Sequence, residues 1–466
     1  MNIRAFALIF TLIASTTLLG DSVEILWQWK IGSSGIQVSQ APDGTIIVAG
    51  SNRLSAYEPD DGGLIWQKDM GEEVSNAAPV IGQDGIFYQM LIHDTDHTRR
   101  LVAFSIETGN QVWEYFPGTT NMSHLLLSNS RLYYVDRSVQ ELKALDASSG
   151  NLVWTYISNE EIDAKITMVR GVIYAYERKN GFWSIIGIDS DNGSNVFSLS
   201  KPFLENQYWS GRRIIGGTGG KIHAQTNTGT VYQIDPSTGD WSVTYSGLKT
   251  TYRLIDANGV TYSEDDDYLI AIKESTGSQI WRFEVDRNAA TETLAATSDG
   301  TLYCSVTIRD PIQDANYLYA IDSTNLTQKF TSGGSKYYAN TKWRLPMDVR
   351  SLVIAKDGNI IVGAADGMLY AIQGSATTGD APWPMYRGNA QNTYSTKSVE
   401  PENNQQSGDE LAPILPSWTW MELYPWIYNE QTDTWFYMSP VIIGDTAVNY
   451  LYNYSTQTWT PLETGE

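Results

Sequence analysis

The sequence predicts an all-β fold: one eight-bladed β-propeller of four-stranded antiparallel blades, followed by a small β-hairpin module. Two observations carry this prediction. Segments similar to LVAFSIETGNQVW (101–113) start at residues 54, 101, 142, 185, 231, 269, 318 and 369. Their period of about 45 residues is typical of radially repeating β architectures. A turn that leads into an alternating strand precedes each copy, as in DGTIIVAG (43–50) and DGTLYCSV (299–306).

Each repeat is interpreted as strand, turn, strand, loop, strand, TG-type turn, strand. The turn glycine allows a positive φ without a Cβ clash. An aromatic residue four positions later is expected to fill the space between adjacent blades, and it is Trp66, Trp113, Trp154, Phe197 or Trp281. Two repeats depart from the pattern: Leu326 replaces the glycine in repeat seven, and Trp241 directly follows Asp240 in repeat five.

The eighth copy stops after its third strand, because GSATTGDAPWP shows no matching fourth strand. The missing strand is predicted at the other end of the repeats, in EILWQWKIG (24–32). Pairing this segment with the eighth copy would close the ring and remove open sheet edges. The propeller is therefore expected to span residues 23–394.

These repeats resemble the pyrroloquinoline quinone (PQQ) enzyme-like propeller repeat of the WD40/YVTN-like quinoprotein superfamily, with a consensus close to LYALDAxTGxxxW. APWPMYRGNAQNTYS (381–395) is similar to the WPMFRGNAQHTG-type segment that accompanies such propellers. The resemblance implies the propeller but not the cofactor. Proteins with this repeat include quinoprotein dehydrogenases and non-catalytic scaffolds, among them a lipoprotein of the outer-membrane β-barrel assembly machinery.

A dehydrogenase of this class is expected to have a vicinal Cys-Cys pair, a Glu, Asn and Asp calcium site and a Trp stacked on the quinone. The chain has one cysteine, Cys304, so that pair cannot form and the thiol is expected to be buried. No GxSxG, HExxH, P-loop or Rossmann pattern is present. We therefore expect no catalytic residue, cofactor or metal. The alternatives are a PQQ-dependent oxidoreductase and a polysaccharide-active propeller enzyme.

Three acidic segments resemble metal-binding sequences. His93 and His97 flank two aspartates in LIHDTDHTRR, and SEDDDY (263–268) occupies the same connection in repeat six. Both are interpreted as solvated loops rather than zinc or calcium sites. DSDNGSN (189–195) is in register with the TG turns and is interpreted as one of them.

The composition limits partners and location. There are 53 acidic and 31 basic residues, for a formal net charge of −22. Such a surface repels nucleic-acid phosphates and anionic membranes. Residues 1–22 have the pattern of a signal peptide, with an uncleaved anchor as the alternative, and no later segment could cross a membrane. A bacterial protein of the periplasm or cell exterior is expected, as a monomer.

Beyond the propeller, residues 395–412 are predicted to be a flexible linker and residues 413–466 an aromatic β module. WIYNEQTDTWFYM (426–438) aligns with YLYNYSTQTWTPL (450–462), which indicates two hairpins that include Trp426, Trp435 and Trp459. These aromatics either build the core of a miniature domain or form an exposed docking patch.

Binding is expected on the face of the propeller where the long connections lie, around the mouth of the channel. Candidate contact residues come from the predicted loops 201–212 and 332–346, and they are Tyr208, Trp209, Arg212, Tyr338, Trp343 and Arg344. The alternative is that these side chains pack locally beneath the loops. The favoured function is a non-catalytic binding or scaffold propeller with a protein or glycan partner.

Overall fold

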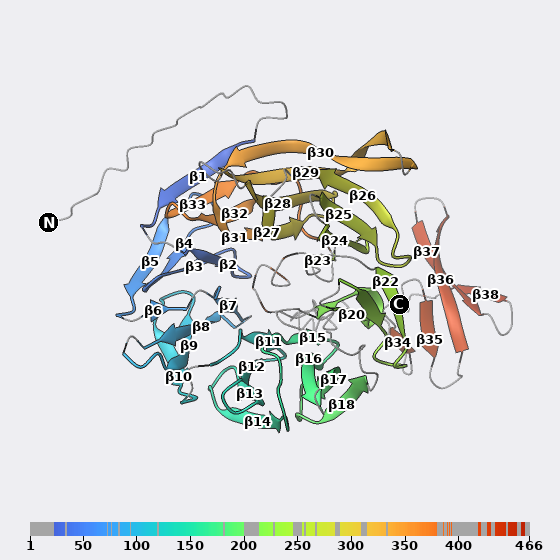
Figure 1. Cartoon of the computed structure of the whole chain (residues 1–466). Coiled ribbons are helices and arrows are strands. Elements are labelled where there is room, and N and C mark those ends of the chain that lie inside the picture. Colours follow the sequence, from blue (N-terminus) through green and yellow to red (C-terminus); the bar gives the residue numbers. More distant parts are fainter. Residues whose placement is uncertain are drawn as a thin grey trace. The chain divides into compact units, whose positions relative to one another are not determined.

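The computed structural model describes residues 23–199, 214–379 and single positions between 385 and 393, with short internal gaps, and the backbone of strands between 418 and 461. These residues form β-strands and one short 3-10 turn, η1 (Thr218–Gly220), and no α-helix. The all-β prediction is confirmed. The sheets between residues 23 and 379 succeed one another around a common centre (Figure 1).

The repeats follow one another in chain order, and all strand pairs within a repeat are antiparallel. The strands of repeats six and seven belong to one eight-stranded sheet, because an outer strand of each pairs in parallel with the other. Repeat one contains β2 (Gln37–Gln40), β3 (Ile46–Gly50), β4 (Arg53–Tyr57) and β5 (Leu64–Asp69). Repeat two contains β6 (Glu73–Val74), β7 (Val80–Ile81), β8 (Ile86–Ile92), β9 (Arg99–Ser105) and β10 (Gln111–Tyr115). Repeat three contains β11 (Leu126–Ser128), β12 (Arg131–Asp136), β13 (Glu141–Asp146) and β14 (Leu152–Ile157). Repeat four contains β15 (Thr167–Val169), β16 (Val172–Lys179), β17 (Phe182–Asp189) and β18 (Asn195–Leu199).

The remaining repeats continue this order. Repeat five contains β19 (Ile215–Gly216), β20 (Ile222–Gln225), β21 (Val231–Ile234) and β22 (Trp241–Tyr245). Repeat six contains β23 (Leu254–Ile255), β24 (Val260–Asp265), β25 (Tyr268–Lys273) and β26 (Gln279–Glu284). Repeat seven contains β27 (Ala289–Ala296), β28 (Thr301–Ile308), β29 (Ala315–Thr331) and β30 (Gly334–Pro346). Repeat eight contains β31 (Val349–Ile354), β32 (Ile360–Ala364) and β33 (Met368–Ile372).

The N-terminal strand β1 (Ile25–Lys30) completes the sheet of repeat eight. It pairs antiparallel with β33, with Trp27 opposite Ala371. The two strands lie side by side in Figure 1, where the start of the chain is blue and repeat eight is orange. The segment that precedes repeat one is thereby hydrogen-bonded to the last repeat of the chain.

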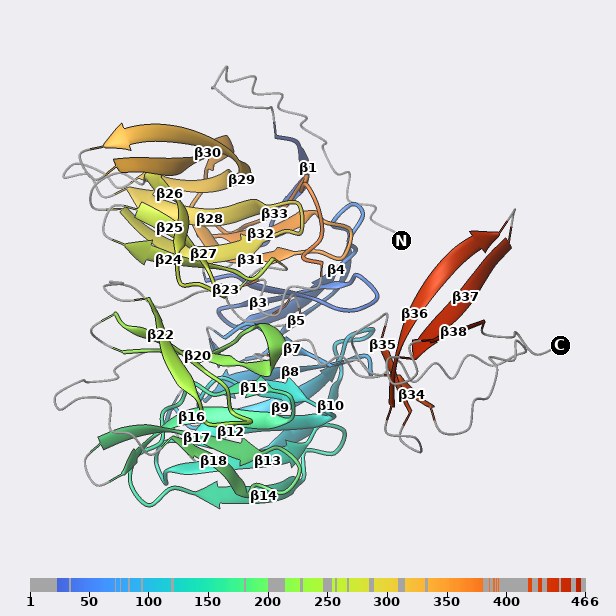
Figure 2. The same ribbon diagram turned by 90° about the vertical axis from the view of Figure 1, so that its right-hand side faces the viewer.

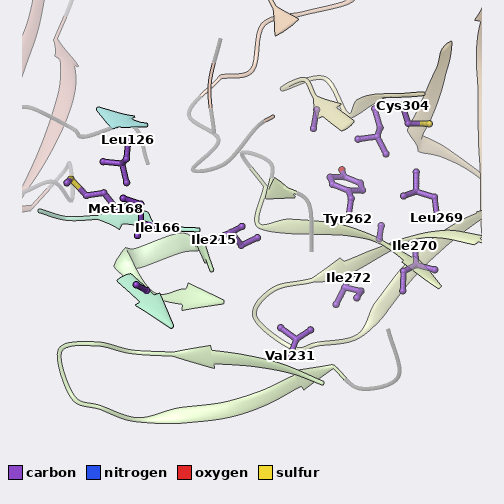
Figure 3. Packing of buried hydrophobic residues seen from close by; sticks show 14 of the residues in the cluster. Leu126, Ile166, Met168, Ile215, Val231, Tyr262, Leu269, Ile270, Ile272 and Cys304 are labelled. Atoms are coloured by element: carbon purple, nitrogen blue, oxygen red, sulfur yellow. The ribbon is translucent and has the colours of Figure 1, made fainter. Parts of the chain in front are cut away.

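The core lies between neighbouring sheets. All of β3 is buried, whereas the outer strand β5 is mostly exposed. The largest buried cluster joins residues from repeats three to seven, including Leu126, Met168, Ile215 and Tyr262 (Figure 3). Cys304 is fully buried in it, as predicted. Face-to-face burial of apolar strands is what stabilises such an architecture.

A tryptophan on each of several outer strands contacts the TG turn of the next repeat. The indole Nε1 of Trp66 donates to the carbonyl oxygen of Ile106 at 2.7 Å. The same bond joins Trp113 to Ala147 at 2.9 Å and Trp154 to Ser190 at 3.0 Å. These bonds tie consecutive sheets to each other as well as packing them.

The turn glycine makes this contact possible. A Cβ on Gly150 would lie 2.7 Å from the Trp113 ring, and its φ of +73° already disfavours other residues. Tyr88 packs against the same indole at 5.7 Å between ring centroids, and its hydroxyl also donates to the Ala147 carbonyl. Gly150 thus contacts Trp113 of the preceding repeat, whereas Trp154, four positions after Gly150, contacts the TG turn of the following repeat.

The junction between repeats five and six replaces this aromatic contact with a polar one. His223 occupies the position of Tyr88, and Gln233 and Ser242 pair where other repeats pair alanine with tryptophan. The Glu274 carboxylate accepts hydrogen bonds from His223 Nε2 at 2.8 Å and Gln233 Nε2 at 3.3 Å. The backbone N–H of Thr218 donates to the same oxygen at 2.9 Å.

Burial acts against ionisation of this carboxyl group. Desolvation raises the pKa of Glu274, but the hydrogen bonds from His223 and Thr218 outweigh it and hold the pKa below its ordinary value of 4.5. The side chains of His223 and Glu274 are 1% and 2% exposed, so the carboxylate depends on these donors rather than on water.

A segment after repeat eight runs along the first strands of several repeats. Met385 forms a β-bridge with Ala295 of repeat seven, and its sulfur accepts from the N–H of Ile354 in repeat eight. The Gln391 side chain donates to the carbonyl of Gln40, and the Gln391 carbonyl accepts from Ile81. The carbonyl of Thr393 accepts from Leu127 in repeat three. This inner strap, defined by Met385, Gln391 and Thr393, thus covers edge groups of five repeats.

Residues 399–466 form a separate compact unit. Its five strands pair in the order β34 (Trp418–Trp420), β35 (Trp426–Asn429), β36 (Thr434–Ile443), β37 (Thr446–Asn453) and β38 (Thr458–Pro461). The two predicted hairpins correspond to β35–β36 and β37–β38, and β36 pairs with β37 to join them in one sheet.

Replacing Trp113 with Phe should keep the ring and remove its hydrogen bond to Ala147, a loss of about 1 kcal/mol of stability. Trp113→Ala should cost roughly 3–5 kcal/mol. Urea denaturation measures both. Val112→Ala is the control, because that neighbouring side chain is 50% exposed. Equal small effects of Trp113→Ala and Val112→Ala would show that the indole is not a junction residue.

Glu274→Gln should lower stability at pH 7 by roughly 2 kcal/mol, because a charged acceptor is lost. The folded pKa of Glu274 lies below its ordinary value of 4.5. The carboxylate therefore contributes stability above about pH 4.5, and this contribution disappears as the pH falls through the folded pKa. The difference in unfolding free energy between the variant and the wild type, measured by denaturation, should be smaller at pH 4 than at pH 7. A constant difference would contradict the ionised assignment, and Glu107→Gln on an exposed turn is the control.

Candidate functional site

Three of the six residues predicted on the channel-mouth loops lie in the described part of the chain. Tyr208, Trp209 and Arg212 lie outside the described residues. Tyr338, Trp343 and Arg344 lie in β30, so the prediction of a loop over 332–346 was wrong. They sit on the outer strand of repeat seven, beside repeat six (Figure 1 and Figure 2).

The absence of a turn glycine explains this difference. Asp322 still accepts from the N–H groups of Thr324 and Asn325, as the aspartates of other TG turns do. With Leu326 in place of glycine the chain does not reverse, and the pairing register moves from Asp322 directly to Leu326. β29 continues to Thr331, and β30 returns from Gly334. Repeat seven therefore carries a longer hairpin than the other repeats.

Trp343 is a structural residue. It lies opposite Ala320 in the register, as Trp113 lies opposite Ala103. Its ring packs on Tyr303 with centroids 5.8 Å apart, which matches the pair formed by Tyr88 and Trp113. The long hairpin thus restores the outer-strand tryptophan at a position that sequence spacing could not indicate.

Arg344 belongs to an aromatic group at the base of the hairpin. It lies directly opposite Tyr319, and its Nη1 donates to the Tyr319 hydroxyl at 3.1 Å. The guanidinium also lies 4.8 Å from the centroid of Tyr317. Tyr319 in turn contacts Phe283 of repeat six edge to face, 5.8 Å between centroids. Arg344 itself is exposed.

A second group of cations and tyrosines lies further along the hairpin. Lys329 Nζ is 4.3 Å from the centroid of the Tyr338 ring, and the Tyr338 ring meets Tyr268 at 6.5 Å. The Arg282 guanidinium is stacked 4.5 Å from Tyr268. Arg282 is also the residue through which β26 pairs, in parallel, with Tyr338 of β30. Cation–π contacts of this kind contribute about 0.5–1 kcal/mol each at exposed sites.

Two lysines face each other at the end of the hairpin, and we call them the lysine pair. Lys329 lies directly opposite Lys336 in the antiparallel register. Like charges in this arrangement destabilise a hairpin by up to about 1 kcal/mol. Among the described residues, no carboxylate pairs with either lysine. The arrangement is unfavourable for the isolated fold, and such local conflicts are expected at functional sites.

The charge of the hairpin is opposite to that of the chain. Residues 326–347 contain Lys329, Lys336, Lys342 and Arg344 and no aspartate or glutamate, although the whole chain has a net charge of −22. This absence of acidic residues was the sequence signal for the site. The register that places two of the cations opposite each other could not be derived without knowing that the turn at Leu326 is lost.

The other predicted features give no comparable site. Within the described residues, no three histidine, cysteine or acidic side chains are placed to hold a metal ion. His93 Nδ1 lies 3.0 Å from Asp96, whose bonds to Thr98 lower its pKa to about 2. Asp189 accepts from Asp191 and Asn192, as a TG turn requires. Trp426, Trp435 and Trp459 lie in β35, β36 and β38, and their side chains lie outside the description.

A hollow between repeats two and three is lined by Ala78, Tyr88, Gln89, Met90 and Leu125 among others, and has room for about one water molecule. Small-molecule sites are usually about 300–1,000 Å³. The hollow is thus far smaller than a typical ligand pocket.

The arrangement of sheets defines the class of protein: a β-propeller. A profile of the family described as "Outer membrane protein assembly factor BamB" matches residues 20–140 and 126–251. The repeats of this chain are therefore of the PQQ-like β-propeller type. No curated protein sequence matches it.

Three solved structures share the fold. BamB from Moraxella catarrhalis is 14% identical, with 76% of this chain and 100% of that chain covered and a TM-score of 0.55. The computationally designed Ika8 protein is 16% identical, with 74% and 98% covered and a TM-score of 0.54. The C-terminal WD40 domain of Sif2 is 7% identical, with 76% and 99% covered and a TM-score of 0.56.

Lys336→Glu should stabilise the hairpin by about 0.2–1 kcal/mol, because it converts a like-charge pair into an opposite-charge pair. The melting temperature should rise in 50 mM salt, and the rise should vanish in 1 M salt. Lys30→Glu on exposed β1 makes the same change in net charge and is the control. An equal rise for both variants, or a fall for Lys336→Glu, would show that the lysines do not repel each other.

Proposed function

We propose that this protein is a non-catalytic scaffold propeller of the cell envelope, which holds a protein partner on the hairpin of repeat seven. The family description, an outer-membrane protein assembly factor, supports a role in protein assembly. The observation that carries the proposal is the lysine pair. A fold that keeps two like charges opposite each other has a use for them outside its own core.

The finer architecture belongs to the same proposal. Eight blades form one ring, closed by β1 on β33, and the indole contacts make this ring a rigid support. Residues 1–22 direct export to the periplasm or cell exterior, the chain acts as a monomer, and the C-terminal sheet is a second docking module. The described part of the chain has no helix long and apolar enough to span a bilayer.

A photo-crosslinking residue at Tyr337, which is 47% exposed beside the lysine pair, should capture a defined protein partner in intact cells. The same residue at Val243, 52% exposed on β22, is the matched control. Identical products from both positions, or none from Tyr337, would contradict the proposed surface. Fractionation of the same cells tests export, because a scaffold of the envelope cannot remain in the cytoplasm.

A further inference from the structure

We propose that the lysine pair binds an acidic, extended polypeptide segment, with its carboxylates placed between Lys329 and Lys336. This inference rests on the proposed function and names the chemistry of the partner. Two ammonium groups on opposite strands present a ready-made position for an anion, because a carboxylate between them removes their repulsion and gains two charge-assisted hydrogen bonds.

The surroundings of the lysine pair favour carboxylate recognition over sugar stacking. Tyr338 is 9% exposed, and Lys329 lies 4.3 Å from the centroid of its ring, so that ring is not free to stack on a sugar. The contact instead holds the Lys329 ammonium in one place, which reduces the entropy lost on binding. Tyr337, on the other face of the strand, offers an exposed side surface for an apolar residue of the same segment.

The partner segment contacts the side chains of the hairpin and does not pair with its backbone as an additional strand. The outer strand that follows the lysine pair carries Lys342, Arg344 and Pro346, and charged residues and proline discourage backbone pairing at a sheet edge. Arg344, exposed at the base of the hairpin, extends the basic surface for further acidic residues of the segment.

The charge of the whole protein makes this surface selective. An acidic segment is repelled by a chain of net charge −22 and attracted by the one stretch, residues 326–347, that has four cations and no acidic residue. Binding should therefore be localised at the hairpin and weaken steeply with salt.

Labelled poly-L-glutamate is the probe, and its fluorescence anisotropy on the chain lacking residues 1–22 measures binding in 50 and 300 mM salt. We expect Lys336→Glu to weaken binding at least tenfold and Lys329→Glu/Lys336→Glu to abolish it. Lys30→Glu, with the same change in net charge, should alter affinity less than twofold. Lys336→Glu should melt no lower than wild type, which separates lost binding from lost folding.

An equal loss with Lys30→Glu would overturn the inference, because binding would then depend on net charge alone. Polygalacturonate that binds more tightly than poly-L-glutamate would also overturn it, in favour of an anionic glycan. If poly-L-glutamate does not bind while Tyr337 still captures a partner in cells, the scaffold function stands and the acidic segment is rejected. If poly-L-glutamate binds through the lysine pair but no partner is captured, the scaffold function fails and the anion site stands.

Discussion

The contact between an outer-strand tryptophan and the glycine turn of the next repeat holds this fold together. Most repeats form a small sheet of four strands with two edges, so the stability of each sheet depends on its neighbours. The indoles of Trp66, Trp113 and Trp154 each satisfy a carbonyl of the following sheet and pack on a glycine that leaves room for the ring. Because these contacts are directional, they set the position of each sheet against the next, and apolar packing then fills the remaining space.

Where the tryptophan–glycine contact is altered, polar or charged side chains lie at or near the junction between repeats. Phe197 keeps the ring but has no N–H to donate, and the next junction replaces the aromatic pair with the network around Glu274. Repeat seven keeps its tryptophan only by extending the hairpin so that Trp343 reaches the place opposite Ala320. Lys329 and Lys336 lie in the extended part of this hairpin. The unusual surface is thus a consequence of how the repeat recovers its structural contact.

Much of the fold could be predicted because each repeat contains the local signals that determine its strands and turns. These signals are a glycine at the turn, an alternating strand and an aromatic residue at fixed spacing. Leu326 marked the repeat that would deviate, but its effect depends on how far two strands can pair once the turn is lost, which is a property of tertiary packing. For that reason Tyr338, Trp343 and Arg344 were placed on a loop and are found in a strand. The link from His223 to Glu274 joins residues 51 apart in different sheets, and no local pattern reports it.

The inner strap gives the chain an unusual route out of the propeller. After Met385 it crosses the first strands of several repeats, and Thr393 is bonded to Leu127 of repeat three. If the residues that follow are attached to a surface, tension enters the propeller through this bond and then through those of Gln391 to Ile81 and Gln40. The load is then carried by the innermost strands of repeats one to three, at Gln40, Ile81 and Leu127. A tether at the C-terminal side would therefore pull first on the inner strand of repeat three, and on repeat one, next to the β1–β33 pair, only after the earlier bonds had broken.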